Sequence, residues 1–69
     1  MVGVFKTETS FVATNENTGT LLFQSISRWL TRVVANEYEE LGVPVTIKER
    51  SVIRATRDGH LVKITDRIA

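Results

Sequence analysis

The stretch RSVIRATRDGHLVKITDR, residues 50–67, decides the fold. Polar and apolar residues alternate on both sides of Asp58-Gly59, a dipeptide typical of the two-residue type I′ turn of a β-hairpin. We therefore predict a strand over about 43–57, a turn at 58–59 and a strand over about 60–68.

A two-residue turn sets which residues lie opposite one another in the hairpin. Counting outward from the turn places apolar residues such as Ala55 and Val62 opposite one another on one face. On the other face Arg54 lies opposite Lys63, and this pair belongs to a row of cations. The predicted anion-binding residues of this row are Lys48, Arg50, Arg54, Lys63 and Arg67.

The predicted row has no internal counter-charge, because Glu49 and Asp66 have the opposite parity. Directly opposed like charges cost up to roughly 1 kcal/mol per pair, so such a row would suit a phosphate backbone or an acidic protein surface. Alternatively, the cations bind no ligand: they are solvated and prevent sheet edges of different chains from associating. The strand over 43–57 is also long. A bulge near Glu49–Ser51 would remove Lys48 from the row.

Residues 21–41 have the apolar periodicity of an amphipathic helix, which Gly42 and Pro44 would end. We expect its apolar sector to face the sheet. Alternatively, 20–24 forms the second strand of an N-terminal hairpin, and the helix begins near Ser25 or Ser27. The predicted apolar sector holds Leu22, Phe23, Ile26, Trp29, Leu30, Val33, Val34 and Leu41, and the predicted polar side holds Gln24, Arg28, Thr31, Arg32, Ala35 and Glu39.

Residues 2–14 are rich in Val, Phe and Thr, which predicts a strand that joins the C-terminal hairpin. Phe5 and Phe11 on this strand are expected in the core. The whole chain, 1–69, is then a single α+β domain of order β-α-β-β, with one amphipathic helix packed on an antiparallel sheet.

Three helix residues are candidates for an interface. Glu37 falls within the apolar sector, where a carboxylate needs a partner such as Arg57 or a second chain. Trp29 and Tyr38 lie at the edges of that sector, and aromatic residues in such places are enriched at interfaces.

Composition narrows the classes of function. The 69 residues carry a net charge of +1, and residues 43–69 are basic whereas residues 1–42 are acidic. The sequence has no cysteine, and this excludes disulfides and cysteine-based zinc sites. With a single histidine, His60, and no phosphate-binding loop, we expect no enzyme, no metal and no cofactor.

No signal peptide or membrane-spanning run is visible, so we expect a cytoplasmic protein that does not bind membranes. Small domains without disulfides often self-associate, which favours a homodimer.

The sequence thus predicts a small non-catalytic binding protein. The first hypothesis is binding to the phosphate backbone of DNA or RNA through the basic ribbon face. The alternative is a protein–protein interaction module (an inhibitor, adaptor or regulatory subunit, as in mobile elements) that acts as a homodimer or on an acidic partner.

Overall fold

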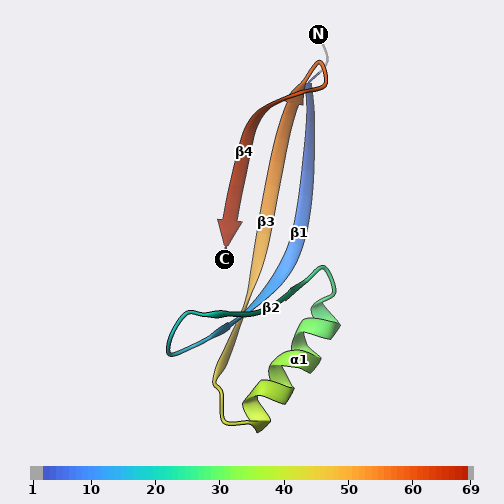
Figure 1. Ribbon diagram of the computed structural model, residues 1–69. Coiled ribbons are helices and arrows are strands. Elements are labelled where there is room, and N and C mark those ends of the chain that lie inside the picture. Colours follow the sequence, from blue (N-terminus) through green and yellow to red (C-terminus); the bar gives the residue numbers. More distant parts are fainter. Residues whose placement is uncertain (1–2, 69) are drawn as a thin grey trace.

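The computed structural model describes residues 3–68, so Val2, which the sequence assigned to the first strand, lies outside the described residues. It contains one helix and one four-stranded antiparallel sheet of order β2-β1-β3-β4 (Figure 1). The predicted α+β class and the pairing of the first strand with the C-terminal hairpin are confirmed. The elements are β1 (Gly3–Asn15), β2 (Leu21–Ser25), α1 (Arg28–Glu40), β3 (Val45–Arg57) and β4 (His60–Ile68).

The N-terminal hairpin replaces the first two turns of the expected helix. The backbone N–H of Asn15 donates to the carbonyl of Thr20, and Gly19 takes a positive φ of 74° to close the turn. The chain then pairs with β1 through Leu21–Ser25. A helix start near 21 is therefore wrong, and the alternative reading of 20–24 as a strand is confirmed.

The helix begins where Ser27 caps it. The Ser27 Oγ accepts the backbone N–H of Leu30 at 3.1 Å, which satisfies one of the free donors of the first turn. The Ser27 carbonyl accepts the Thr31 hydroxyl at 2.9 Å.

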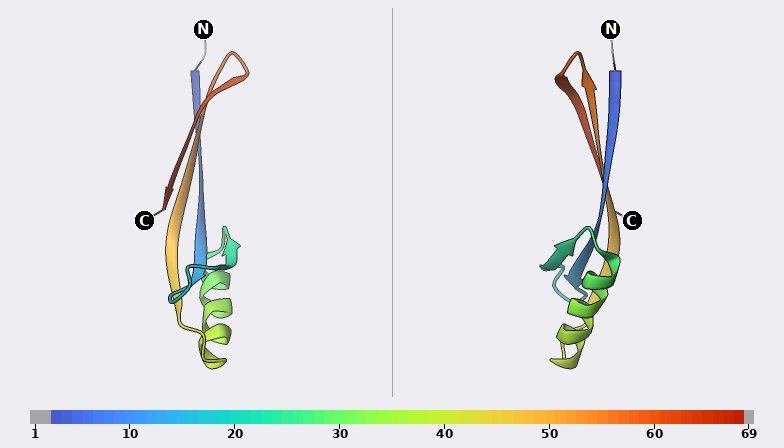
Figure 2. Two further views of the ribbon diagram at one scale, coloured as in Figure 1. Left: turned by 60° about the vertical axis from the view of Figure 1, so that its left-hand side comes forward. Right: turned by 90° about the vertical axis from the view of Figure 1, so that its right-hand side faces the viewer.

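The molecule is a long sheet with a helix at one end (Figure 2). It measures 53 × 22 × 15 Å and has a radius of gyration of 15.5 Å, against about 11 Å for a compact domain of this length. We call the part beyond the helix the β-arm, which comprises 3–10, 50–57 and β4. Neither face of the β-arm is covered by another layer within residues 3–68.

The two faces of the sheet follow from the register of β1 and β3, which runs without a break from Gly3–Arg57 to Asn15–Val45. The predicted bulge near Glu49–Ser51 therefore does not form. Odd-numbered residues of both strands lie on the side of α1, which we call the helix-side face. Even-numbered residues lie on the opposite, open face.

The core is small and lies at the helix end of the sheet. Ala13, Thr31 and Ala35 are fully buried, and Val12 is almost so. Thr31 and Ala35 were predicted on the polar side of the helix, and that prediction is wrong. Small side chains at these two positions allow close approach of α1 to the sheet, and the buried Thr31 hydroxyl is satisfied by its bond to the helix backbone.

Part of the predicted apolar sector consequently lies away from the sheet, whereas Val33 and Val34 are half-buried. The side chains of Ile26, Trp29, Leu30 and Leu41 are exposed, with Trp29 at 74%. Phe5 on the β-arm is also exposed, at 78%, because no layer covers its face, whereas Phe11 is half-buried near α1. The expectation that these large residues form the core is therefore wrong for the exposed ones, and Phe11 is only partly buried.

No helix among residues 3–68 is long and apolar enough to cross a membrane.

Candidate functional site

The β3–β4 turn has the predicted geometry. Asp58 and Gly59 both take positive φ, 52° and 79°, as a type I′ turn requires. Thr56 lies opposite Leu61 as expected. The pairing next to the turn is therefore confirmed.

Beyond Leu61 the register of β4 differs from the prediction. Ala55 lies opposite Lys63 and not Val62, because Val62 is an extra residue in a β-bulge. One extra residue reverses the faces of every later side chain of β4. The expected pairs Arg54–Lys63 and Arg50–Arg67 are wrong. Instead Arg54 lies opposite Ile64, and Arg50 opposite Ile68.

The predicted row of cations is therefore divided between the two faces. Lys48, Arg50 and Arg54 lie on the open face, whereas Lys63 and Arg67 lie on the helix-side face. The shift also removes the two like-charge pairs, whose cost the sequence already indicated. The single cation-rich surface expected for phosphate binding does not form.

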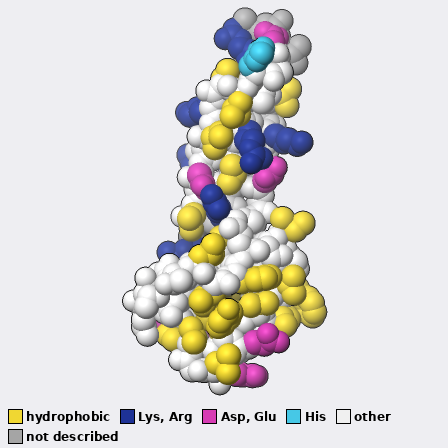
Figure 3. All heavy atoms as spheres, viewed as in Figure 1, with side chains coloured by type: hydrophobic (Ala, Val, Ile, Leu, Met, Phe, Trp, Pro, Cys, Tyr) yellow, Lys and Arg dark blue, Asp and Glu magenta, His cyan; other side chains and the backbone are white. Residues whose placement is uncertain are grey.

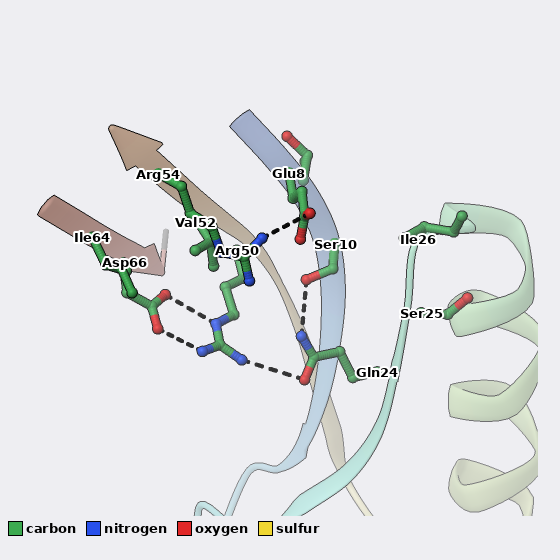
Figure 4. A pocket seen from close by; sticks show the side chains of 11 residues that line it. Glu8, Ser10, Gln24, Ser25, Ile26, Arg50, Val52, Arg54, Ile64 and Asp66 are labelled. Carbon is green, nitrogen blue, oxygen red and sulfur yellow. Dashed lines mark hydrogen bonds and ion pairs between the residues drawn. The ribbon is translucent and has the colours of Figure 1, made fainter. Parts of the chain in front are cut away.

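Asp66 neutralises Arg50. The bulge brings Asp66 to the open face, where both its carboxylate oxygens accept hydrogen bonds from the Arg50 guanidinium, Nε to Oδ1 at 2.9 Å and Nη2 to Oδ2 at 2.5 Å (Figure 4). This hydrogen bonding lowers the pKa of Asp66 and raises that of Arg50.

The same guanidinium connects the strands across the open face. Its Nη1 donates to Gln24 Oε1 at 3.5 Å, and Gln24 Nε2 donates to Ser10 Oγ at 2.9 Å (Figure 4). Together Ser10, Gln24, Arg50 and Asp66 link all four strands of the sheet.

A second carboxylate neutralises the neighbouring cation of the row. Arg54 Nη1 lies 2.8 Å from Glu8 Oε1 on β1. These side chains border a shallow groove on the open face that ends at Ile26, where β2 leaves the sheet (Figure 4). The two arginines expected to bind an anion are thus already paired within the chain.

The three helix residues proposed for an interface lie in different environments. Trp29 is exposed and lines a groove with Arg28, Arg32 and Ile47, whereas Tyr38 is half-buried. Glu37 is exposed on α1. Its predicted partner Arg57 is at the tip of the β-arm, opposite Gly3, so that ion pair is wrong.

Exposed apolar side chains are numerous on both parts of the molecule. In Figure 3 they gather over α1 and β2, while Lys and Arg gather over the β-arm. The chain exposes 5200 Å², about 800 Å² more than the roughly 4400 Å² typical of a folded monomer of its mass. The exposed large apolar residues are Val4, Phe5, Leu21, Ile26, Trp29, Leu30, Leu41, Leu61, Val62, Ile64 and Ile68.

One edge of the sheet is open along β1. On the side of β1 away from β3, β2 covers only residues 11–14. Residues 3–10 have no neighbouring strand on that side among the described residues. The signal available in the sequence was the Thr-rich segment with Lys6 and Glu8 on one face.

Comparison with known protein families, curated proteins and solved structures finds no match to this chain. Within residues 3–68, no group of three or more His, Cys, Asp or Glu side chains could hold a metal ion.

Proposed function

We propose that the chain is a protein–protein interaction module that acts as a homodimer. The observation that carries this proposal is the exposure of apolar side chains that a self-sufficient domain buries, such as Phe5, Ile26 and Trp29. Exposed apolar surface beyond what a monomer needs is typical of proteins that associate.

The area is of the right size for a second copy. The surface excess of about 800 Å² equals one partner's share of a standard protein–protein interface. The β-arm adds a second reason, because a three-stranded sheet with two open faces gains little stability from its own side chains. A cytoplasmic setting is part of the proposal, since a cysteine-free chain has no need of an oxidising compartment.

Size-exclusion chromatography with multi-angle light scattering tests the proposal. We expect a molar mass of twice the 7.8 kDa of one chain, and a decrease toward one chain on dilution. A mass of one chain at every concentration up to about 1 mM would contradict it. Absorbance at 260 and 280 nm on the same eluate tests whether nucleic acid co-purifies. Binding to DNA or RNA stays a prediction from the sequence.

A further inference from the structure

The open edge of β1 presents unpaired backbone groups. The N–H and carbonyl of Asn15 bond within the N-terminal hairpin, on the β2 side, whereas the N–H of Glu16 bonds to Pro44, on the β3 side. Backbone direction alternates along a strand, and the β1–β3 register is unbroken. The backbone groups of Phe5, Thr7 and Thr9 therefore point outward from the sheet. An edge of this kind is a template for another strand.

The open face beside this edge carries an unbalanced charge. Lys6 lies directly opposite Arg54, a like-charge pair, and the nearby carboxylate of Glu8 is bound to Arg54. Lys6 itself has no ion-pair partner among residues 3–68. The one carboxylate beside these two cations thus pairs with Arg54 alone.

We propose that a second copy of the chain pairs with this edge, β1 against β1 in antiparallel orientation over Val4–Ser10. Thr7 of each copy lies opposite Thr7 of the other, on the two-fold axis. This register places Lys6 opposite Glu8 of the second copy, and Glu8 opposite its Lys6. The inference rests on the proposed homodimer and specifies the surface through which it forms.

Neighbouring registers lack this complementarity. A two-fold axis at Lys6 would oppose Lys6 to itself, and an axis at Glu8 would oppose Glu8 to itself, both of which are unfavourable. The axis at Thr7 also makes Thr7 a hydrogen-bonded pair, as its outward N–H and carbonyl require.

The other edge of the sheet is less suited to self-pairing. Beyond its bulge, β4 carries Lys63 and Arg67 on one face. A two-fold axis at Thr65, midway between them, would oppose one cation to the other, which is unfavourable. The edge of β1 is therefore the better template for a second copy.

Exposed apolar residues border the proposed interface. Ser25, the last residue of β2, lies opposite Phe11. In the proposed register Val4 of the second copy lies opposite Ser10, so it follows Ser25 along the same edge. Ile26, which is 84% exposed, then lies beside Val4 of the second copy, which is exposed in the single chain.

Single-cysteine variants test the register, because the chain has no cysteine of its own. Residues on the axis of a hydrogen-bonded pair lie about 5.5 Å apart at Cα, within disulfide range. Thr7→Cys should therefore form a covalent dimer on mild oxidation. Thr9→Cys is the matched control, exposed on the same face and edge. In this register the Thr9 positions of the two copies are four residues apart, about 13 Å, so this variant should not cross-link.

Charge exchange gives an independent measurement. Lys6→Glu and Glu8→Lys each create two like-charge contacts across the interface, so each should raise the dimer dissociation constant about tenfold or more. The double exchange restores opposite charges and should recover dimerisation. Circular dichroism of each variant checks that the fold is retained.

The outcomes separate this inference from the proposed function. A wild-type dimer in which Thr7→Cys does not cross-link, or in which Thr9→Cys cross-links equally, would overturn the register while leaving the homodimer intact. A wild-type monomer at all concentrations would overturn both.

Discussion

Arg50 on β3 bonds both carboxylate oxygens of Asp66 on β4, and this pair exists only because the bulge at Val62 brings Asp66 to the open face. Without the bulge, Asp66 would lie on the helix-side face, and Arg67 would lie opposite Arg50. One inserted residue thus exchanges a repulsive contact for an attractive one.

The pair makes stability depend on pH in the acid range. Hydrogen bonds from Arg50 lower the pKa of Asp66 in the folded chain, below the value of about 3.9 for a free side chain. The stabilisation is therefore fully present above that ordinary pKa and is lost as the pH falls through the lowered one. We expect the difference in melting temperature between wild type and Asp66→Asn to be present at pH 7 and to close in acid. A difference that is the same at all pH values would show that the pair contributes no linked protonation.

The internal carboxylates should also limit binding to polyanions. Replacing Glu8 and Asp66 by Gln and Asn frees Arg54 and Arg50 and raises the net charge of the open face by two. We expect this double variant to elute from heparin at higher salt than the wild type. Glu16→Gln with Glu40→Gln is the control, since it changes the net charge equally but far from the arginines. Equal shifts for both variants would mean that net charge, and not the freed arginines, determines retention.

The orientation of α1 predicts which helix substitutions destabilise the chain. Ala35 is fully buried, so Ala35→Leu should overpack the contact with the sheet and cost about 1–3 kcal/mol. Trp29→Gln, at a largely exposed position, should change the free energy of unfolding by about 0.5 kcal/mol or less. Urea unfolding followed by circular dichroism measures both, at a chain concentration at which light scattering gives the mass of one chain. A larger loss of stability for Trp29→Gln than for Ala35→Leu would mean that the apolar sector of the helix faces the sheet, as the sequence predicted.

Local rules predicted the elements of this fold well. Asp58-Gly59 defined the C-terminal hairpin, because turns depend on a few residues with unusual backbone angles. The site depended on two features that local rules do not capture. One is the bulge at Val62, which no residue type next to Val62 indicates.

The other is the direction in which α1 faces. Periodicity identifies the apolar sector of a helix, and a single domain would normally bury it. Here the sheet is contacted by the small side chains of Thr31 and Ala35. If the working unit is a dimer, as we propose, the apolar pattern of the sequence describes the assembly as well as the single chain. Periodicity alone does not separate those two contributions.

The bulge itself gives a decisive test of the β4 register. Val62 has no partner of its own on β3, so its deletion leaves Leu61 opposite Thr56 and Lys63 opposite Ala55 in a regular ladder. We therefore expect deletion of Val62 to preserve the Arg50–Asp66 pair and to change the free energy of unfolding by about 1 kcal/mol or less.

Deletion of Thr65 is the matched control. Thr65 is a regular ladder residue opposite Ile53, and its loss moves Asp66 to the other face and exposes Arg50. We expect this deletion to destabilise the chain more than deletion of Val62, as measured by urea unfolding. If the predicted bulge-free register held instead, Val62 would be a ladder residue and both deletions would shift the pairing, so comparable losses from the two would contradict the bulge.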